Sequence, residues 1–239
     1  MRLLLIRHGQ TIDNVYGRLG TAAPGPGLTE LGERQAAAVP DAIGDEPVEA
    51  IYASTLVRTQ LTAAPLAARC GVDIQVTDAL REIGAGDLEA RSDLDAVRAY
   101  IGTIFTWRDD PDARIPGGEN GTEFMERFSG IINEIAGRHR GTVVVVSHGA
   151  AIRTWASWVP QNVAPDFGLA HPLDNTAMVA LTGLPSGGWV VTEWAGEPVG
   201  GEALEDAAAP DPTGSAGARD VDPAGARDVD QAGARRPLS

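Results

Sequence analysis

The sequence predicts an α/β protein, a three-layer α/β/α sandwich with a mostly parallel central sheet. Short apolar runs rich in β-branched residues alternate along the chain with longer helical patterns. The run TVVVV at 142–146 is apolar at nearly every position, which is typical of a strand covered on both faces. A chain of 239 residues is long enough for one such domain with a substantial core.

Strands are expected wherever an apolar, β-branched run is short, and these runs lie at 2–6, 48–52, 72–77, 142–146, 176–182 and 189–194. The first helix after the opening strand should begin behind Thr29, because threonine is a good N-cap. Pro40 lies inside this pattern, so we expect it to kink or end the helix.

Two further helices carry clear boundary signals. The segment 54–71 begins with Ser54, a residue that can cap a helix, and closes on Gly71, a good helix stop. In 121–137, phenylalanines and isoleucines fall on one stripe, and Asn120 and Glu123 have the spacing of a capping pair. These helices separate the strands and complete the alternation.

The charge excludes several function classes. The net charge is −14, which argues against binding to nucleic acid or to an anionic membrane, since both need a basic face. The sequence contains no lysine, so Schiff-base chemistry and a P-loop lysine are excluded.

The single cysteine, Cys70, excludes an internal disulfide and a four-cysteine zinc site. With no signal-peptide pattern and no long apolar run, a cytoplasmic protein is expected.

The composition changes near the C-terminus. The stretch AGARDVDPAGARDVDQAGARR at 216–236 repeats a unit of small and charged residues with almost no large apolar side chains. Such a segment buries too little surface to offset the entropy lost on ordering it. We therefore expect one domain over residues 1–197 and a disordered tail over 198–239.

Two strand ends carry the same chemistry. The run LLLIRHGQT places Arg7, His8 and Gly9 directly after a strand, and VVVVSHGAAIRT places His148 and Gly149 after another. A strand, a glycine-containing turn and a helix start together present free N–H groups to an anion such as phosphate. Strands of one parallel sheet end at the same edge, so both histidines should meet there.

Two histidines beside an arginine suit phosphoryl transfer. A neutral imidazole is a competent nucleophile towards phosphorus, while arginine and a second, protonated histidine neutralise the phosphoryl oxygens without a metal or cofactor. The leaving oxygen needs a proton, so a carboxylic acid should be near. Arg58 and Glu82 each follow a further strand and can complete such a site.

These motifs together resemble the histidine phosphatase superfamily, the group of phosphoglycerate mutase-like enzymes and many phosphatases. The resemblance covers residues 2–182 through LLLIRHGQT, LTELGERQA, STLVRTQLT, LREIGAGDLE, PGGEN and VVVVSHGAAIR. It implies that His8 is the phosphorylated nucleophile and that Glu82 transfers protons. It further implies a phosphate pocket lined by other residues, namely Arg7, Gly9, Asn14, Arg18, Arg58, His148 and Gly149.

Some candidates have ordinary structural readings. Glu89 is the rival to Glu82 as proton donor, although it fits a loop or helix start. Arg153 and Glu119 each fit two readings equally well, a place at the edge of the site or a surface ion pair. His139 and His171 fit loops better than a site.

Departures from the family pattern bear on specificity. Gln10 stands where the family usually has glutamate, and Gly20 replaces a usual glutamine in a glycine- and proline-rich loop. The segment 93–118 lacks the long insertion with an Arg-Arg pair of the mutases, so the resemblance favours a phosphatase. A phosphoglycerate mutase and a non-catalytic phosphate-binding protein are the alternatives. The expected partner is a small phosphorylated substrate, of phosphosugar or phosphoglycerate type, and the sequence leaves a homodimer open.

Overall fold

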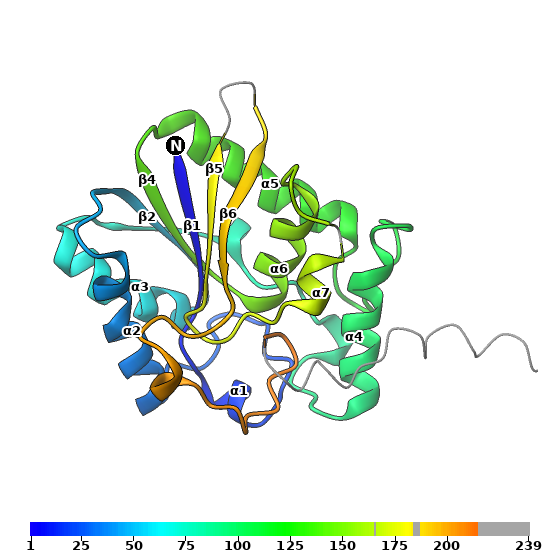
Figure 1. The fold of residues 1–239 in the computed structure, drawn as a ribbon. Coiled ribbons are helices and arrows are strands. Elements are labelled where there is room, and N and C mark those ends of the chain that lie inside the picture. The colour runs from blue at the N-terminus through cyan, green and yellow to red at the C-terminus, as the bar shows by residue number, and fades with distance from the viewer. Residues whose placement is uncertain (165, 184–186, 215–239) are drawn as a thin grey trace, which may run out of the picture.

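The computed structural model describes residues 1–164, 166–183 and 187–214, and within them one six-stranded sheet lies between helices (Figure 1). The strands follow the order β3-β2-β4-β1-β5-β6 across the sheet. Their bounds are β1 Arg2–Arg7, β2 Val48–Ser54, β3 Ile74–Thr77, β4 Thr142–Ser147, β5 Met178–Gly183 and β6 Trp189–Ala195. Each of the six expected strands is present at nearly its predicted position.

The sheet is mostly parallel, as predicted. Strand β4 pairs in parallel with β1 on one side and with β2 on the other, and β2 pairs in parallel with β3. Only β5 and β6 are antiparallel to their neighbours in the described sheet. Arg7 lies opposite Ser147 in the β1–β4 register, so the turns that follow these strands emerge side by side.

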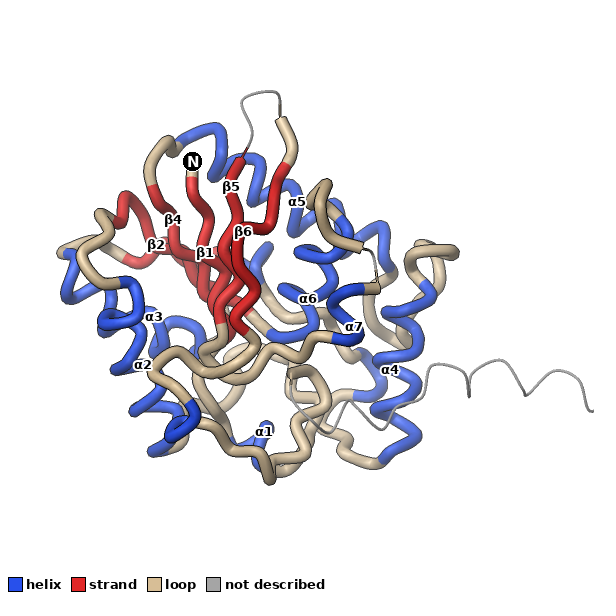
Figure 2. The backbone as a smooth tube through the Cα atoms, in the orientation of Figure 1, coloured by secondary structure: helices blue, strands red, loops and turns tan. Residues whose placement is uncertain are grey.

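Helices cover both faces of the sheet (Figure 2). Their bounds are α1 Ile12–Val15, α2 Glu30–Ile43, α3 Val57–Cys70, α4 Leu94–Thr106, α5 Gly121–Arg138, α6 Gly149–Trp158 and α7 Phe167–Ala170. Strand residues alternate between the two faces: Leu3 and Leu5 belong to the core with α4, α5 and α6, whereas Leu4 and Ile6 belong to the core with α2 and α3. The three-layer prediction is therefore confirmed.

The local boundary signals were partly correct. The Thr29 side chain accepts a hydrogen bond from Gly32 N at 3.1 Å and caps α2, but the helix continues past Pro40 to Ile43. Helix α3 ends at Gly71, which has left-handed backbone angles (φ 66°, ψ 32°). Ser54 is the last residue of β2 rather than a helix cap, because Leu56 occupies the N-cap position of α3.

Helix α5 forms as its sequence predicts. Asn120 and Glu123 make a reciprocal capping box, in which each side chain bonds to the other's backbone N–H. Phe124, Phe128 and Ile132 on its inner stripe are fully buried in the core with α4 and α6. This amphipathic stripe fixes which face of α5 meets the sheet.

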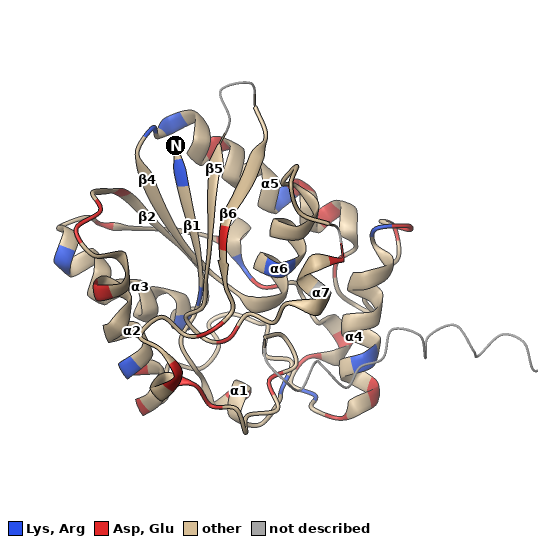
Figure 3. Cartoon of the chain, in the orientation of Figure 1, with Lys and Arg blue, Asp and Glu red and all other residues tan. Residues whose placement is uncertain are grey.

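Charged residues lie mainly on helices and loops, and the central strands carry few of them (Figure 3). Across the described ranges, no helix combines the length and apolarity that a membrane crossing requires.

The segment after β6 differs from the expected tail. Residues 198–214 lie against the domain, near α1 and beyond the lower end of β1 in Figure 1, and Val199 and Asp211 in it are buried. It is held largely by polar contacts with specific partners, which composition does not reveal. The repeats expected to be disordered, within 215–239, lie outside the described residues.

Candidate active site

The turn after β1 holds His8 in a defined chemical form. His8 is 3% exposed, and its backbone N–H donates to Ser147 O at 3.0 Å, which ties it to the end of β4. Its ring Nδ1 lies 2.8 Å from Gly9 O. Because a carbonyl oxygen only accepts hydrogen bonds, Nδ1 carries the proton and Nε2 keeps its lone pair. The Nε2 atom is therefore available as a nucleophile.

The turn after β4 holds His148 beside it. The two rings are 5.2 Å apart between centroids and meet edge to face. Nδ1 of His148 accepts a hydrogen bond from Nη2 of Arg58 at 3.1 Å, and Nε2 lies 2.8 Å from Ser54 Oγ. A guanidinium only donates, so Nδ1 of His148 is unprotonated and the ring is neutral.

Burial and cations keep both imidazoles neutral. Burial is the largest cause that lowers the pKa of His8 well below its ordinary value, followed by the charges of Arg58 and Arg7. The pKa of His148 is also well below its ordinary value, through burial first and then Arg58. The second histidine was expected to be protonated, but burial, first, and the facing Arg58 lower the pKa of His148 and favour the neutral ring.

Arg58, near the start of α3, supplies charge at the edge of the sheet. Its Nη2 also donates to Gly20 O at 2.9 Å. Burial lowers the pKa of Arg58 to about 10. Its Nε and Nη1, and Nε of Arg7, are buried and have no hydrogen-bond partner within the described residues. Buried guanidinium donors of this kind suit the oxygens of a phosphoryl group.

Glu82 lies in the loop after β3, and its carboxylate contacts the N-terminal end of α6. Its carboxylate accepts hydrogen bonds from the backbone N–H of Ala151 at 2.9 Å and Ala150 at 3.2 Å, and from Ile83 N at 2.9 Å. The N-terminal amides of α6, which the sequence analysis assigned to an anion, thus hold this acid. Burial raises the pKa of Glu82 above its ordinary value, and the three N–H groups and Arg58 oppose that rise.

Arg7 is fully buried, and its side chain contacts the C-terminal segment. Nη1 donates to Leu173 O at 2.9 Å, and Nη2 donates to the Asp211 carboxylate and to Thr213 Oγ1 at 3.2 Å. No sequence signal points to Asp211 or Thr213, because they lie more than two hundred positions from Arg7 in a segment without an apolar pattern.

The two glycines of the turns allow close packing. A Cβ atom on Gly9 would lie 2.7 Å from Gly32 O in α2, and one on Gly149 would lie 2.6 Å from Thr213 O. A side chain at either position would displace backbone, so both turns require glycine.

The two residues expected in the pocket wall, Asn14 and Arg18, lie in different surroundings. Asn14 is buried, and its Oδ1 accepts from Thr11 N at 2.8 Å, so it braces the turn after His8. Arg18 is 44% exposed, lies 3.9 Å from Asp13 Oδ1 and stacks over the Tyr16 ring, away from the two histidines' contacts. Among the described contacts Arg18 has none with either histidine, so its place in the pocket wall stays a prediction.

Asn175 and Thr176 were missed by sequence reasoning. Nδ2 of Asn175 donates to His8 O at 3.0 Å, and Thr176 N donates to Arg7 O at 3.1 Å. Thr176 is fully buried and has a φ of 61°, a costly conformation for a β-branched residue. Backbone strain of this kind leaves no periodic signal in a sequence.

The rival acids have structural contacts. Glu89 accepts hydrogen bonds from Thr21 N at 2.8 Å and Thr21 Oγ1 at 2.5 Å, so it anchors that loop. Glu119 pairs with Arg127 at 2.6 Å and accepts from Gly84 N at 2.8 Å. Both support the segment around Glu82 without contacting the histidines in the hydrogen bonds described.

The other candidates lie outside the cluster. Arg153 in α6 is buried and donates to Gly168 O at 2.8 Å and Thr213 O at 3.1 Å. His139 follows α5 and bridges Tyr52 and Glu49, so it joins elements at the other end of β4. His171 is exposed and bonds Phe167 O through Nδ1 at 2.8 Å.

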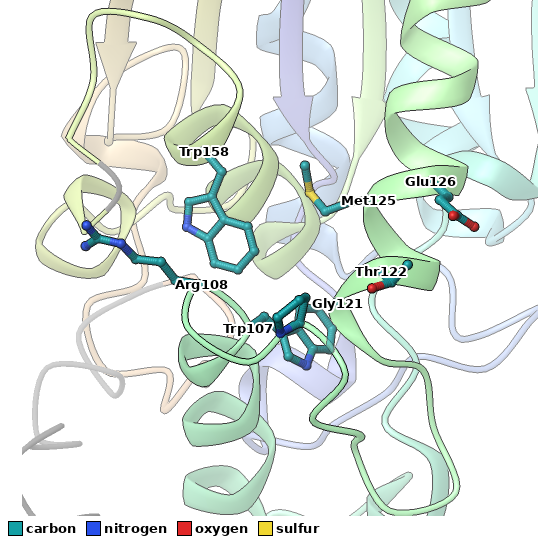
Figure 4. A pocket seen from close by; sticks show the side chains of 8 residues that line it. Trp107, Arg108, Gly121, Thr122, Met125, Glu126 and Trp158 are labelled. Atoms are coloured by element: carbon teal, nitrogen blue, oxygen red, sulfur yellow. The ribbon is translucent and has the colours of Figure 1, made fainter.

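A separate hollow of about 500 Å³ opens where α4 ends and α5 begins (Figure 4). Trp158 in its wall is the last residue of α6, whose ten residues span about 15 Å from the His148 end. Its lining contains none of the predicted site residues and comprises Trp107, Arg108, Pro111, Gly121, Thr122, Met125, Glu126 and Trp158. It is therefore distinct from the histidine cluster.

Comparison with known sequences identifies relatives of this arrangement. Residues 3–196 match the model of the histidine phosphatase superfamily (branch 1). The chain is 35% identical over 219 residues to a PE-PGRS family protein of Mycobacterium tuberculosis. This match covers 84% of this chain and 38% of that longer protein. It is 30% identical over 202 residues to a glucosyl-3-phosphoglycerate phosphatase of Mycolicibacterium vanbaalenii, covering 79% and 82% of the two chains.

A further relative carries a mutase name. The chain is 35% identical over 162 residues to a Cronobacter sakazakii protein named "Probable phosphoglycerate mutase GpmB", covering 64% of this chain and 71% of that one.

Solved structures share the fold. A mycobacterial glucosyl-3-phosphoglycerate phosphatase in complex with VO3 superposes with a TM-score of 0.69 at 28% identity, covering 81% of this chain and 98% of that one. The α-ribazole phosphatase of Shigella flexneri gives a TM-score of 0.68 at 25% identity, covering 84% and 100%.

Proposed function

This chain belongs to the histidine phosphatase superfamily (branch 1), and on this premise we propose that it is a phosphatase, which hydrolyses monoesters of small phosphorylated metabolites through a phosphohistidine at His8. The observation that carries the proposal is the tautomer of His8. Nδ1 donates to Gly9 O, which leaves the Nε2 lone pair facing away from that bond.

In the first step, Nε2 of His8 attacks phosphorus and the ester P–O bond breaks. The buried donors of Arg58 and Arg7 stabilise the charge on the transferring oxygens. Glu82 gives its proton to the leaving oxygen, a role favoured by its raised pKa.

In the second step, water attacks the phosphohistidine and the P–N bond breaks. The Glu82 carboxylate accepts the proton of that water, inorganic phosphate leaves, and Nε2 of His8 regains its lone pair. His148, neutral in its bonds to Arg58 and Ser54, holds the Arg58 guanidinium at the reacting group.

The substrate class proposed is a phosphosugar or phosphoglycerate ester. The supporting observation is the similarity to glucosyl-3-phosphoglycerate phosphatases in sequence and in structure. The donors also fit, because Nε of Arg7 and Nε and Nη1 of Arg58 are buried without a partner among the described residues and can bind phosphate oxygens.

Trapping the intermediate tests the proposal. The parent protein is mixed with a phosphorylated substrate and quenched in alkali, which preserves phosphohistidine, and the labelled peptide is identified by mass spectrometry. We expect the trapped phosphoryl group on His8, and we expect His8→Ala to abolish both the phosphorylated peptide and phosphate release. His171→Gln, at an exposed histidine, is the control and should behave as the parent. Label on another residue, or full turnover by His8→Ala, would contradict the mechanism.

A phosphoglycerate mutase is the second candidate, favoured by the 35% identity to the protein named as a mutase. The two activities differ in where the phosphoryl group goes. A mutase returns it to a bound acid, so isomerised phosphoglycerate would accumulate without free phosphate. A phosphatase releases phosphate in proportion to the alcohol formed.

A further inference from the structure

The segment 198–214 reaches the proposed phosphate site from beyond the family match, which ends at residue 196. It carries four acidic residues and no basic one, and it lies against a region with three buried arginines. Opposite charges therefore face each other between this segment and the site.

Asp211 makes the central contact. Its carboxylate accepts a hydrogen bond from Nη2 of Arg7, and the two side chains are 2% and 0% exposed. Thr213 adds its Oγ1 to the same nitrogen at 3.2 Å, and its backbone oxygen accepts from Arg153 at 3.1 Å. Leu173 O holds Nη1. Nε is then the one Arg7 nitrogen without a partner among the described residues.

The segment is shaped to make this contact. Pro210 and Pro212 flank Asp211, and a residue before proline is restricted towards extended backbone angles. Thr213 N and Oγ1 both bond to Asp211 Oδ1 at 3.2 Å. The carboxylate is thereby presented in one orientation.

Two glycines of the site make room for the segment. A Cβ atom on Gly17 would lie 2.7 Å from Pro210 O, and one on Gly149 would lie 2.6 Å from Thr213 O. Farther along, Asp206 accepts from Gln10 Nε2 at 2.7 Å and Leu204 O accepts from Gln35 Nε2 at 2.8 Å. The segment thus follows the turn that holds His8.

We propose that Asp211 is an internal ligand of the phosphate site, whose carboxylate occupies Arg7 in the resting enzyme and is displaced by the phosphate group of the substrate. The inference rests on the proposed function, because it assigns Arg7 to phosphate. A carboxylate and a phosphate oxygen are acceptors of the same kind, so they compete for the same guanidinium N–H groups. The segment therefore weakens substrate binding and raises KM.

The first measurement uses the full-length parent. Hydrogen–deuterium exchange is recorded with and without saturating inorganic phosphate. Displacement of Asp211 frees the segment, so we expect faster amide exchange in 198–214 when phosphate binds. Slower or unchanged exchange there would overturn the proposal, because a segment that only braces Arg7 becomes no looser on binding.

The second measurement compares variants by calorimetry with inorganic phosphate. Asp211→Asn keeps the shape and removes the charge, so we expect about a tenfold or greater fall in the phosphate Kd and a lower KM with kcat retained. Glu202→Gln, which removes an exposed charge from the same segment, should leave both values as in the parent.

The outcomes separate this proposal from the catalytic one. A raised KM or a lost kcat in Asp211→Asn would show that Asp211 only braces Arg7. That result would overturn the proposed displacement of Asp211 but leave the proposed catalytic mechanism standing. If neither parent nor Asp211→Asn binds phosphate or releases it from an ester, the phosphate site itself is contradicted.

Discussion

Nη2 of Arg58 lies 3.1 Å from Nδ1 of His148, and this contact makes the histidine an acceptor. The ring is completely buried and already opposed by positive charge, so protonation would break a hydrogen bond and add a like charge. The pKa of His8 beside it is also well below its ordinary value, through burial first and then the charges of Arg58 and Arg7. The site therefore holds two neutral imidazole rings next to the positively charged side chains of Arg58 and Arg7.

This arrangement predicts a stability that falls in acid. Both histidines have folded pKa values well below the ordinary value of 6.5, so the unfolded chain binds more protons once the pH drops through that value. The Tm should fall as the pH is lowered from 7.5 to 5.5. His148→Gln, which cannot protonate, should reduce this dependence, whereas the exposed-site variant His171→Gln should not. An equal pH dependence in both variants would contradict the assignment.

Glu82 can be distinguished from the phosphate-binding residues by its leaving-group dependence. An alkyl alkoxide needs a proton as it leaves, and positioned acids contribute about 10²–10⁴-fold, whereas p-nitrophenolate leaves readily without one. Glu82→Gln should therefore slow alkyl phosphates far more than p-nitrophenyl phosphate in kcat/KM.

Arg58→Ala is the matched comparison, because the proposed mechanism assigns Arg58 to the transferring group, so its loss should affect both esters similarly. If Glu82→Gln slows both esters by equal factors, another group is the acid, and Glu89 with its contacts to Thr21 is the next to test.

Asn175 is expected to act by holding the His8 backbone. Its Nδ2 donates to His8 O at 3.0 Å in a buried setting. Asn175→Ala leaves that carbonyl without this donor and lets the His8 ring shift, so we expect a roughly tenfold fall in kcat with KM nearly unchanged. Asn162→Ala removes a comparable bond to Val191 O on the exposed surface and should leave kcat as in the parent. A change in KM alone would contradict a positioning role.

Activity is expected to be independent of metal ions. In the proposed mechanism, Arg7 and Arg58 supply the positive charge needed at the phosphoryl oxygens, through the two Nε atoms and Nη1 of Arg58. Turnover should persist in excess EDTA, and vanadate should inhibit as a transition-state mimic. Loss of activity on chelation with recovery on adding Mg²⁺ or Zn²⁺ would contradict this prediction.

The sequence by itself determined the six strands, several helix ends and the position of both histidines directly after strands. Alternating apolar runs identified the strands, Gly71 and the Asn120–Glu123 pair identified helix ends, and both histidine turns followed from their place after strands. These features are local, because backbone propensity, capping and side-chain periodicity act within a few residues.

Tertiary structure decided which groups meet. Glu82 bonds to the first amides of α6, Ser54 reaches His148, and Arg18 lies 3.9 Å from Asp13 Oδ1. The contact between Arg7 and Asp211 joins the first strand to a segment that composition alone assigned to a disordered tail. Such contacts depend on the closure of long loops and on burial of charge against charge, and neither leaves a periodic pattern in the chain.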